Sequence, residues 1–98
     1  MRVHWTNRAR ARLRLIHDYI GESSPQSALT VVGRITAKSM QLIELPNSGR
    51  KVPEYQRNDV REILERPYRI IYKIKSDQID VLTVMHYRQI LPVDVSQL

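Results

Sequence analysis

The chain has 98 residues, 42% of them hydrophobic, with a formal net charge of +6 and no cysteine. This length supports one domain spanning residues 1–98, since two cores of half this size would not be stable. The absence of cysteine excludes a disulfide framework, a thiolate zinc site and a cysteine nucleophile. No hydrophobic run approaches the roughly 20 residues that cross a bilayer, and the N-terminus lacks the apolar core of a signal peptide. We therefore expect a cytoplasmic protein that does not act at a membrane.

The first half of the chain predicts one short strand followed by two helices. Residues 3–5 alternate apolar and polar side chains, which is typical of a strand. Between residues 9 and 20, apolar side chains recur at helical spacing, and Gly21 is a suitable helix end. Ser24-Pro25 is a strong start for a second helical pattern, which Pro46 ends. With so short a connection, these helices should form an antiparallel hairpin.

The second half predicts three strands. After an irregular stretch at residues 51–59, residues 60–65 alternate charged and apolar side chains as a strand does. Residues 68–74 and 79–84 are rich in β-branched and aromatic side chains, and the polar turn between them predicts an antiparallel hairpin. The polar tail at residues 92–98 is expected to be a loop or loosely attached.

This order predicts an α+β domain in which the helical hairpin packs on one face of a three-stranded antiparallel meander. Which face of the meander is buried stays open, because Ile70 and Ile71 make it apolar on both sides. The strand hairpin should gather Arg69, His86, Tyr87 and Arg88 at one edge of the sheet. Such a group suits an anionic ligand, and the net charge favours an anionic partner of some kind.

The order and spacing of these segments resemble the RelE/ParE superfamily of bacterial toxins from type II toxin–antitoxin modules. The resemblance runs through nearly the whole chain. It rests on Trp5, Ala9, Leu13, Ile16, Tyr19-Ile20, Ser24-Pro25, Ala28, Leu45-Pro46, Gly49-Arg50, Val52-Pro53-Glu54, Arg61-Glu62, Tyr68-Arg69-Ile70-Ile71-Tyr72, Val81-Leu82, Val84 and His86. It implies a toxin without metal or cofactor, neutralised by a small acidic cognate antitoxin in a hetero-oligomer.

The two branches of the superfamily imply different targets. ParE-like members poison DNA gyrase, and the long helical hairpin beginning at Ser24-Pro25 resembles that branch more closely, so we favour it. RelE-like members cut messenger RNA on the ribosome, which is the alternative. A third interpretation is a degenerate, non-toxic relative that only binds its antitoxin.

Ribonuclease activity of the RelE type would need a general base, a cation at the phosphate and a general acid. The resemblance implies Glu54 as the base and Arg69 as the phosphate-binding cation, with His86 or Tyr87 handling the proton of the leaving group. Each has a structural alternative: Glu54 in an ordinary ion pair, Arg69 as an outward-facing strand cation, and His86 and Tyr87 as exposed or packed ring side chains. The residues after His86 also depart from the nuclease pattern, since Tyr87 replaces a small residue and Gln89 a basic one.

A second set of residues is expected to bind the target or the antitoxin. Its members are basic or aromatic side chains near the predicted sheet edge. They are Arg50, Arg61, Arg69, Tyr72 and Arg88.

Overall fold

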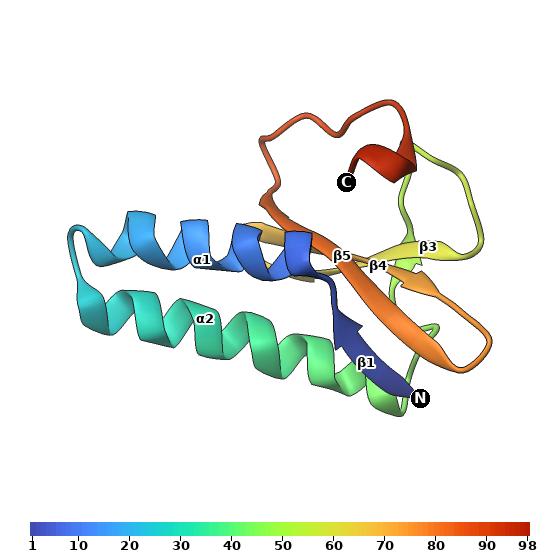
Figure 1. Cartoon of the computed structure of the whole chain (residues 1–98), viewed down its shortest axis with the longest axis horizontal. Helices are drawn as coiled ribbons and strands as arrows, with labels where there is room; N and C mark the ends of the chain where they lie inside the picture. Colours follow the sequence, from blue (N-terminus) through green and yellow to red (C-terminus); the bar gives the residue numbers. More distant parts are fainter.

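The computed structural model describes residues 1–98. Its five strands form one mixed sheet in the order β1–β5–β4–β3–β2 (Figure 1). The strands are β1 (Arg2–Trp5), β2 (Arg50–Lys51), β3 (Val60–Glu65), β4 (Tyr68–Ile74) and β5 (Gln78–His86). β3, β4 and β5 form the predicted antiparallel meander, and β1 pairs parallel to β5. The α+β prediction is therefore confirmed.

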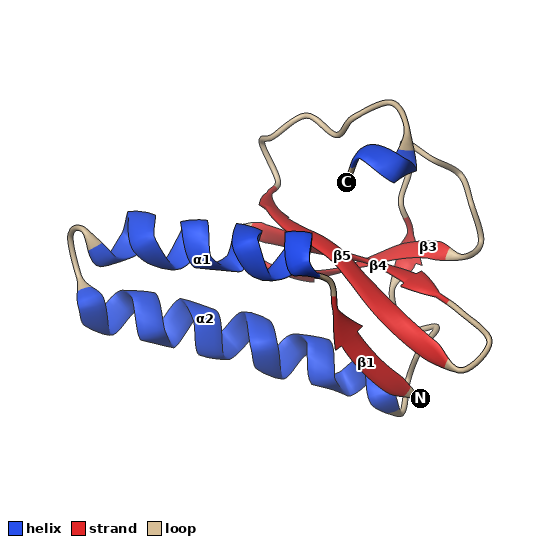
Figure 2. Cartoon of the chain, viewed as in Figure 1, coloured by secondary structure: helices blue, strands red, loops and turns tan.

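Two helices form the predicted hairpin and lie side by side on one side of the sheet (Figures 1 and 2). Helix α1 (Asn7–Gly21) begins where the Thr6 side chain accepts a hydrogen bond from the Ala9 amide. Helix α2 (Pro25–Met40) begins in the same way at Ser24. Both caps satisfy amides that have no partner inside the helix. A short 3₁₀ turn, η1 (Gln41–Ile43), follows α2, and no helix combines the length and apolarity that a membrane span requires.

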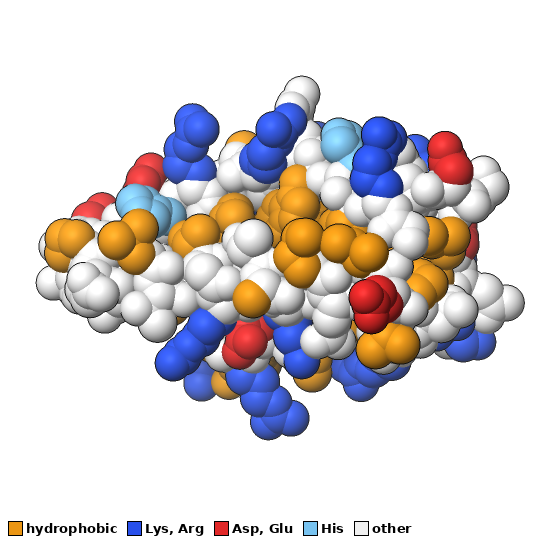
Figure 3. Space-filling view, turned by 90° about the horizontal axis from the view of Figure 1, so that it is seen from below, with side chains coloured by type: hydrophobic (Ala, Val, Ile, Leu, Met, Phe, Trp, Pro, Cys, Tyr) orange, Lys and Arg blue, Asp and Glu red, His pale blue; other side chains and the backbone are white.

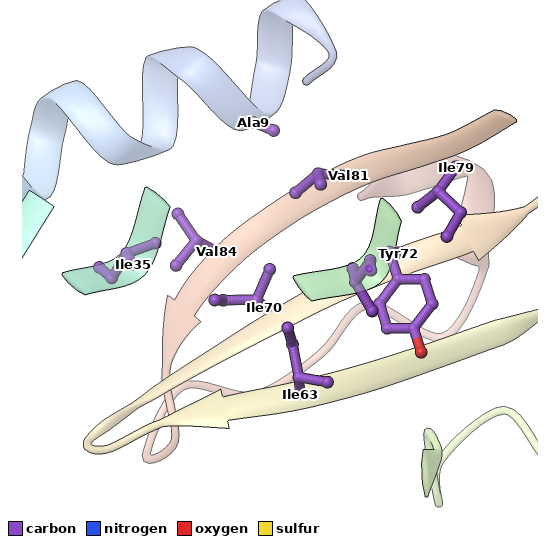
Figure 4. Packing of buried hydrophobic residues seen from close by; sticks show 9 residues of the cluster. Ala9, Ile35, Ile63, Ile70, Tyr72, Ile79, Val81 and Val84 are labelled. Atoms are coloured by element: carbon purple, nitrogen blue, oxygen red, sulfur yellow. The ribbon is translucent and has the colours of Figure 1, made fainter. Parts of the chain in front are cut away.

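The main core lies between the helices and the sheet (Figure 4). Ala9 of α1 and Ile35 of α2 pack there against side chains from alternate positions of the central strands. These strand residues are Ile63, Ile70, Tyr72, Ile79, Val81 and Val84. Burial of this apolar stripe, rather than helix propensity alone, holds the helices in place.

A second, smaller core covers the opposite face of the sheet. Ile71 points there, away from Ile70, so both faces of the meander are buried. Residues 92–98 are mostly loop, in line with the first of the two expected alternatives, but they are not loosely attached: Val95 and Leu98 pack on this core, and the Tyr55 hydroxyl donates a 2.6 Å hydrogen bond to the Pro92 carbonyl. The tail ends in the 3₁₀ turn η2 (Val95–Gln97). Scattered apolar residues in a polar tail are enough to bury it when a second apolar sheet face is available.

One further short strand, β2, lies at the start of the stretch that was predicted to be irregular. Its two residues pair antiparallel with Glu62 and Arg61 of β3. Gly49 just before it lies so close to the sheet that an added Cβ would come within 2.5 Å of both the Glu62 carbonyl oxygen and the Tyr72 hydroxyl. A glycine is thus required here for close approach of the backbone, and periodicity could not predict a two-residue strand.

Candidate functional site

A cleft of about 680 Å³ opens beside the connection between β3 and β4. Its walls come from three separated segments: the loop after β2, the β3–β4 hairpin, and the residue that follows β5. The lining residues are Arg50, Pro53, Glu54, Leu64, Arg66, Pro67, Tyr68, Arg69 and Tyr87. Three of the four nuclease candidates, Glu54, Arg69 and Tyr87, therefore line one cleft; the sequence placed Arg69 and Tyr87 at a common sheet edge, and the structure adds Glu54.

The guanidinium of Arg69 is bound by two carboxylates. Its Nη1 and Nη2 donate to Glu54 at 2.9 and 3.0 Å, and its Nε donates to Glu62 at 2.5 Å. Only 9% of the Arg69 side chain is exposed. The interpretation of Arg69 as an outward-facing strand cation is therefore wrong, because the second core covers the sheet face to which it points.

Arg69, Glu54, Glu62 and Arg50 form one cluster of ion pairs, and Glu62 is the member that the sequence analysis missed. Its carboxylate is fully buried and accepts one hydrogen bond from Arg69 and another, at 2.7 Å, from the Arg50 Nε. A buried carboxylate persists only when it is paired and hydrogen-bonded. The signal was available, since a tight connection between the two strands sets Leu64 opposite Arg69 and thereby Glu62 diagonal to it.

The ion pair between Arg69 and Glu54 shifts the pKa values of both side chains. The hydrogen bonds from Arg69 are the main reason why the pKa of Glu54 lies below its ordinary value of 4.5, and they outweigh the effect of burial. Correspondingly, the hydrogen bond to Glu54 is the main reason why the pKa of Arg69 is raised. Both groups stay ionised at neutral pH. A general base works best with a pKa near the operating pH, so Glu54 in this ion pair is a weak proton acceptor.

The fourth nuclease candidate, His86, lies outside this cleft. It lines a neighbouring groove against α1, together with Leu15, Ile16 and Tyr19. Its ring stands edge-on to Tyr68, with centroids 6.0 Å apart, and its Nδ1 accepts a hydrogen bond from the Arg88 amide. Successive strand residues point to opposite faces, so Arg69 and His86, which pairs with the residue before Arg69, are directed to different sides of the sheet.

The expected binding residues divide into buried and exposed members. Tyr72 is fully buried, donates to the Pro46 carbonyl and accepts from the Gly49 amide, so its side chain offers no surface to a partner. Arg61 donates to the carbonyl oxygens of Asn58 and Gly49 and holds that loop.

Two of the expected binding cations remain at the surface. Arg50 is exposed at the rim of the cleft. Arg88 is exposed beside Tyr87, over whose ring its guanidinium lies at 5.6 Å, a cation–π geometry.

Comparison with known proteins decides the family. The family described as "ParE toxin of type II toxin-antitoxin system, parDE" matches residues 3–91. The chain belongs to the ParE toxin family. Its sequence is 40% identical over 93 residues to the protein Y4kP of Sinorhizobium fredii, and the alignment covers 93% of each chain. It is 33% identical over 84 residues to Toxin RelE2 of Caulobacter vibrioides, covering 86% of this chain and 92% of that one.

A solved structure supports the same assignment. A chain of the chromosomal ParDE TA system from P. aeruginosa superposes with a TM-score of 0.74 at 30% identity. The likeness covers 88% of this ParE-family chain and 95% of the other. The resemblance to toxins of type II toxin–antitoxin systems is thus confirmed, and membership in a parDE family implies a cognate antitoxin as partner.

One face of this ParE-family toxin is notably apolar. Seen from the α2 side, hydrophobic side chains form a band with Lys and Arg side chains along its margins (Figure 3). The large hydrophobic residues that α2 and the segment after it leave exposed are Leu29, Met40, Ile43 and Leu45. No group of three or more His, Asp or Glu side chains lies close enough together to hold a metal ion.

Proposed function

We propose that this ParE-family toxin inhibits DNA gyrase through protein–protein contacts and is held inactive in a hetero-oligomer with a small acidic antitoxin. The observation that carries the choice of target is the state of Arg69. A phosphate-binding arginine must present free donors to the phosphoryl oxygens, whereas three Arg69 nitrogens already donate to carboxylates. Membership in the ParE family supports the same choice.

The electrostatics of the cleft also count against phosphodiester cleavage. Glu54 and Glu62 bring two negative charges to the only guanidinium that the resemblance assigns to phosphate. A phosphate entering beside them would be repelled, and it could bind Arg69 only by displacing Glu54. The low pKa of Glu54 further weakens it as a base.

The apolar band supports the antitoxin part of the proposal. Soluble monomers rarely expose contiguous apolar patches of this kind, which are usual at protein–protein interfaces. The net charge of +6 would attract an acidic partner to the basic margins of the band.

Two assays run side by side with purified protein test the proposal: gyrase supercoiling and cell-free translation, each with and without the cognate antitoxin. We expect inhibited supercoiling, intact translation, and full recovery on adding antitoxin. Arrested translation with cleaved message would overturn the gyrase target. If the protein affects neither supercoiling nor translation, the remaining interpretation is a degenerate relative that only binds its antitoxin.

A ribosome-dependent ribonuclease is the second candidate, and one observation favours it: Glu54, Arg69 and Tyr87 line the same cleft. Its test uses Glu54→Gln and Tyr87→Phe, which remove a proton acceptor and a hydroxyl from exposed side chains. If message is cut, both variants should cut it at least tenfold more slowly. Equal rates of message cleavage by the wild type and both variants would leave these side chains without a catalytic role.

A further inference from the structure

Two guanidiniums that line the cleft beside the β3–β4 hairpin, those of Arg50 and Arg66, keep free hydrogen-bond donors. Arg50 uses only its Nε, which donates to Glu62, while its terminal nitrogens make no hydrogen bond within the chain and its side chain is largely exposed. Arg66 is exposed and makes neither a side-chain hydrogen bond nor a salt bridge. The rest of the wall is largely apolar: Pro53, Leu64, Pro67 and the two tyrosine rings.

We propose that this cleft is a peptide subsite that receives one carboxylate side chain of the cognate antitoxin, with an apolar neighbour of that residue lying against the prolines and Tyr87. Arg50 and Arg66 bind the carboxylate. The inference rests on the antitoxin of the proposed function and adds a defined contact site, separate from the apolar band over α2.

The formal charge of the cleft favours one carboxylate over a polyanion. Three arginines and two glutamates among Arg50, Arg66, Arg69, Glu54 and Glu62 leave a net charge of +1. A nucleic acid brings one negative charge per phosphate and relies on several uncompensated cations. The ionised Glu54 would repel such a backbone, whereas a peptide can pair a single carboxylate with the free donors of Arg50 and Arg66 and direct only apolar groups toward Glu54.

The position of Arg50 is pre-organised for this role. The buried Glu62 holds its Nε at 2.7 Å, so that the guanidinium plane is oriented before a partner arrives. A guanidinium held in this way loses less side-chain entropy on binding and keeps a planar edge for a carboxylate. Arg66 supplies a second cation from the turn between β3 and β4, and the exposed Tyr87 ring provides an amphipathic surface of the kind common at interfaces.

The test measures antitoxin affinity by isothermal titration at two salt concentrations, with the full-length toxin and the purified cognate antitoxin. The variants are Arg66→Gln and Tyr87→Ala, which touch no buried ion pair. Lys51→Gln is the matched control: it removes the same charge from the exposed neighbour of Arg50 on β2, outside the cleft. Urea denaturation of each variant checks that its fold is unchanged.

We expect Arg66→Gln and Tyr87→Ala each to weaken binding about tenfold to a hundredfold, as loss of a charge-assisted contact or an interface aromatic does. The salt dependence should also become shallower for Arg66→Gln, because an ion pair has been lost. Lys51→Gln should bind within about twofold of the wild type, since its charge is screened and unpaired.

Two results would overturn the proposal. One is affinity of both cleft variants within the range of Lys51→Gln, which would leave the cleft outside the antitoxin interface. The other is a single-stranded RNA 20-mer that binds the wild type and loses that binding in Arg66→Gln, which would make the ligand a nucleic acid. Inhibition of gyrase supercoiling without antitoxin is measured on the same variants. A result that contradicts the proposed gyrase target can therefore be told apart from one that contradicts the proposed antitoxin subsite.

Discussion

Glu62 and Arg69 form a diagonal cross-strand pair in which the Arg69 Nε lies 2.5 Å from a fully buried carboxylate oxygen. The pair joins β3 to β4 on the sheet face opposite the helices. The same carboxylate holds Arg50, and the same guanidinium holds Glu54. One buried acid therefore organises two of the three arginines that line the cleft.

This arrangement predicts a large loss of stability when one partner alone is removed. Arg69→Met would leave Glu62 buried with only Arg50 to compensate it, and the free energy of unfolding should fall by about 3–5 kcal/mol. The double variant Glu62→Leu/Arg69→Met should regain much of that loss, because no uncompensated charge remains. Urea denaturation of both variants measures this difference. An equal loss of stability in both variants would show that lost packing, and not the uncompensated charge, causes the destabilisation. Because Arg69 variants change the stability of the fold, they are unsuitable for testing activity alone.

The two glycines at 33 and 49 should respond to alanine in opposite directions. Gly49→Ala would place a Cβ within 2.5 Å of the Glu62 carbonyl and the Tyr72 hydroxyl, both fixed in the core, and should destabilise the fold by about 1–3 kcal/mol. Gly33→Ala lies inside α2 with nothing within 4 Å, and should stabilise it by about 0.5–1 kcal/mol. Thermal unfolding of the two variants side by side distinguishes these effects, and a shift in the same direction would contradict the prediction.

The segment that follows β5 should contribute measurably to stability through Leu91. Leu91 is only 8% exposed in the second core, so Leu91→Ala should lower the free energy of unfolding by about 2–4 kcal/mol. Its neighbour Ile90 is 94% exposed, and Ile90→Ala should change stability by less than about 0.5 kcal/mol. If the two variants unfold at the same urea concentration, Leu91 does not pack on the sheet in solution.

Acid should weaken the fold through Asp80 as well as Glu54. Burial raises the pKa of Asp80, but hydrogen bonds from Lys75 and Gln78 outweigh burial and leave the pKa below its ordinary value of 3.8. A depressed carboxyl pKa stabilises the folded state above the pKa of the unfolded chain, and this contribution disappears as the pH falls through the folded-state pKa. The free energy of unfolding should therefore decline from about pH 5 downward as these carboxylates are protonated.

Asp80→Asn isolates this contribution. At pH 7 the variant should be less stable than the wild type by about 1–3 kcal/mol, the range for losing charge-assisted hydrogen bonds. As the pH falls through the lowered folded-state pKa of Asp80, the two proteins should converge, because the wild-type carboxyl then becomes neutral too. Urea denaturation at a series of pH values gives both curves, and parallel curves would show that Asp80 titrates alike in the folded and unfolded chains.

Local patterns in the sequence determined the order of the first strand, the two helices and the β3–β4–β5 meander, as well as the start of the second helix. Periodicity and caps act over a few residues, so the spacing from residue 9 to residue 20, or Ser24 before Pro25, carries its information locally. The sequence also placed Arg69 and Tyr87 near one another, since strand ends in an antiparallel hairpin meet at one edge, whereas the position of Glu54 beside them came only from the structure.

Only the tertiary structure decided the environment of each side chain. Whether Arg69 is an exposed cation or a buried partner of Glu62, whether Tyr72 faces a partner or the core, and whether the tail is free or packed all depend on what covers each sheet face. That cover comes from segments far away in the chain, such as Gly49 beside Tyr72 and Leu91 beside Ile71. Burial and ion pairing are set by these long-range contacts, which no local period encodes.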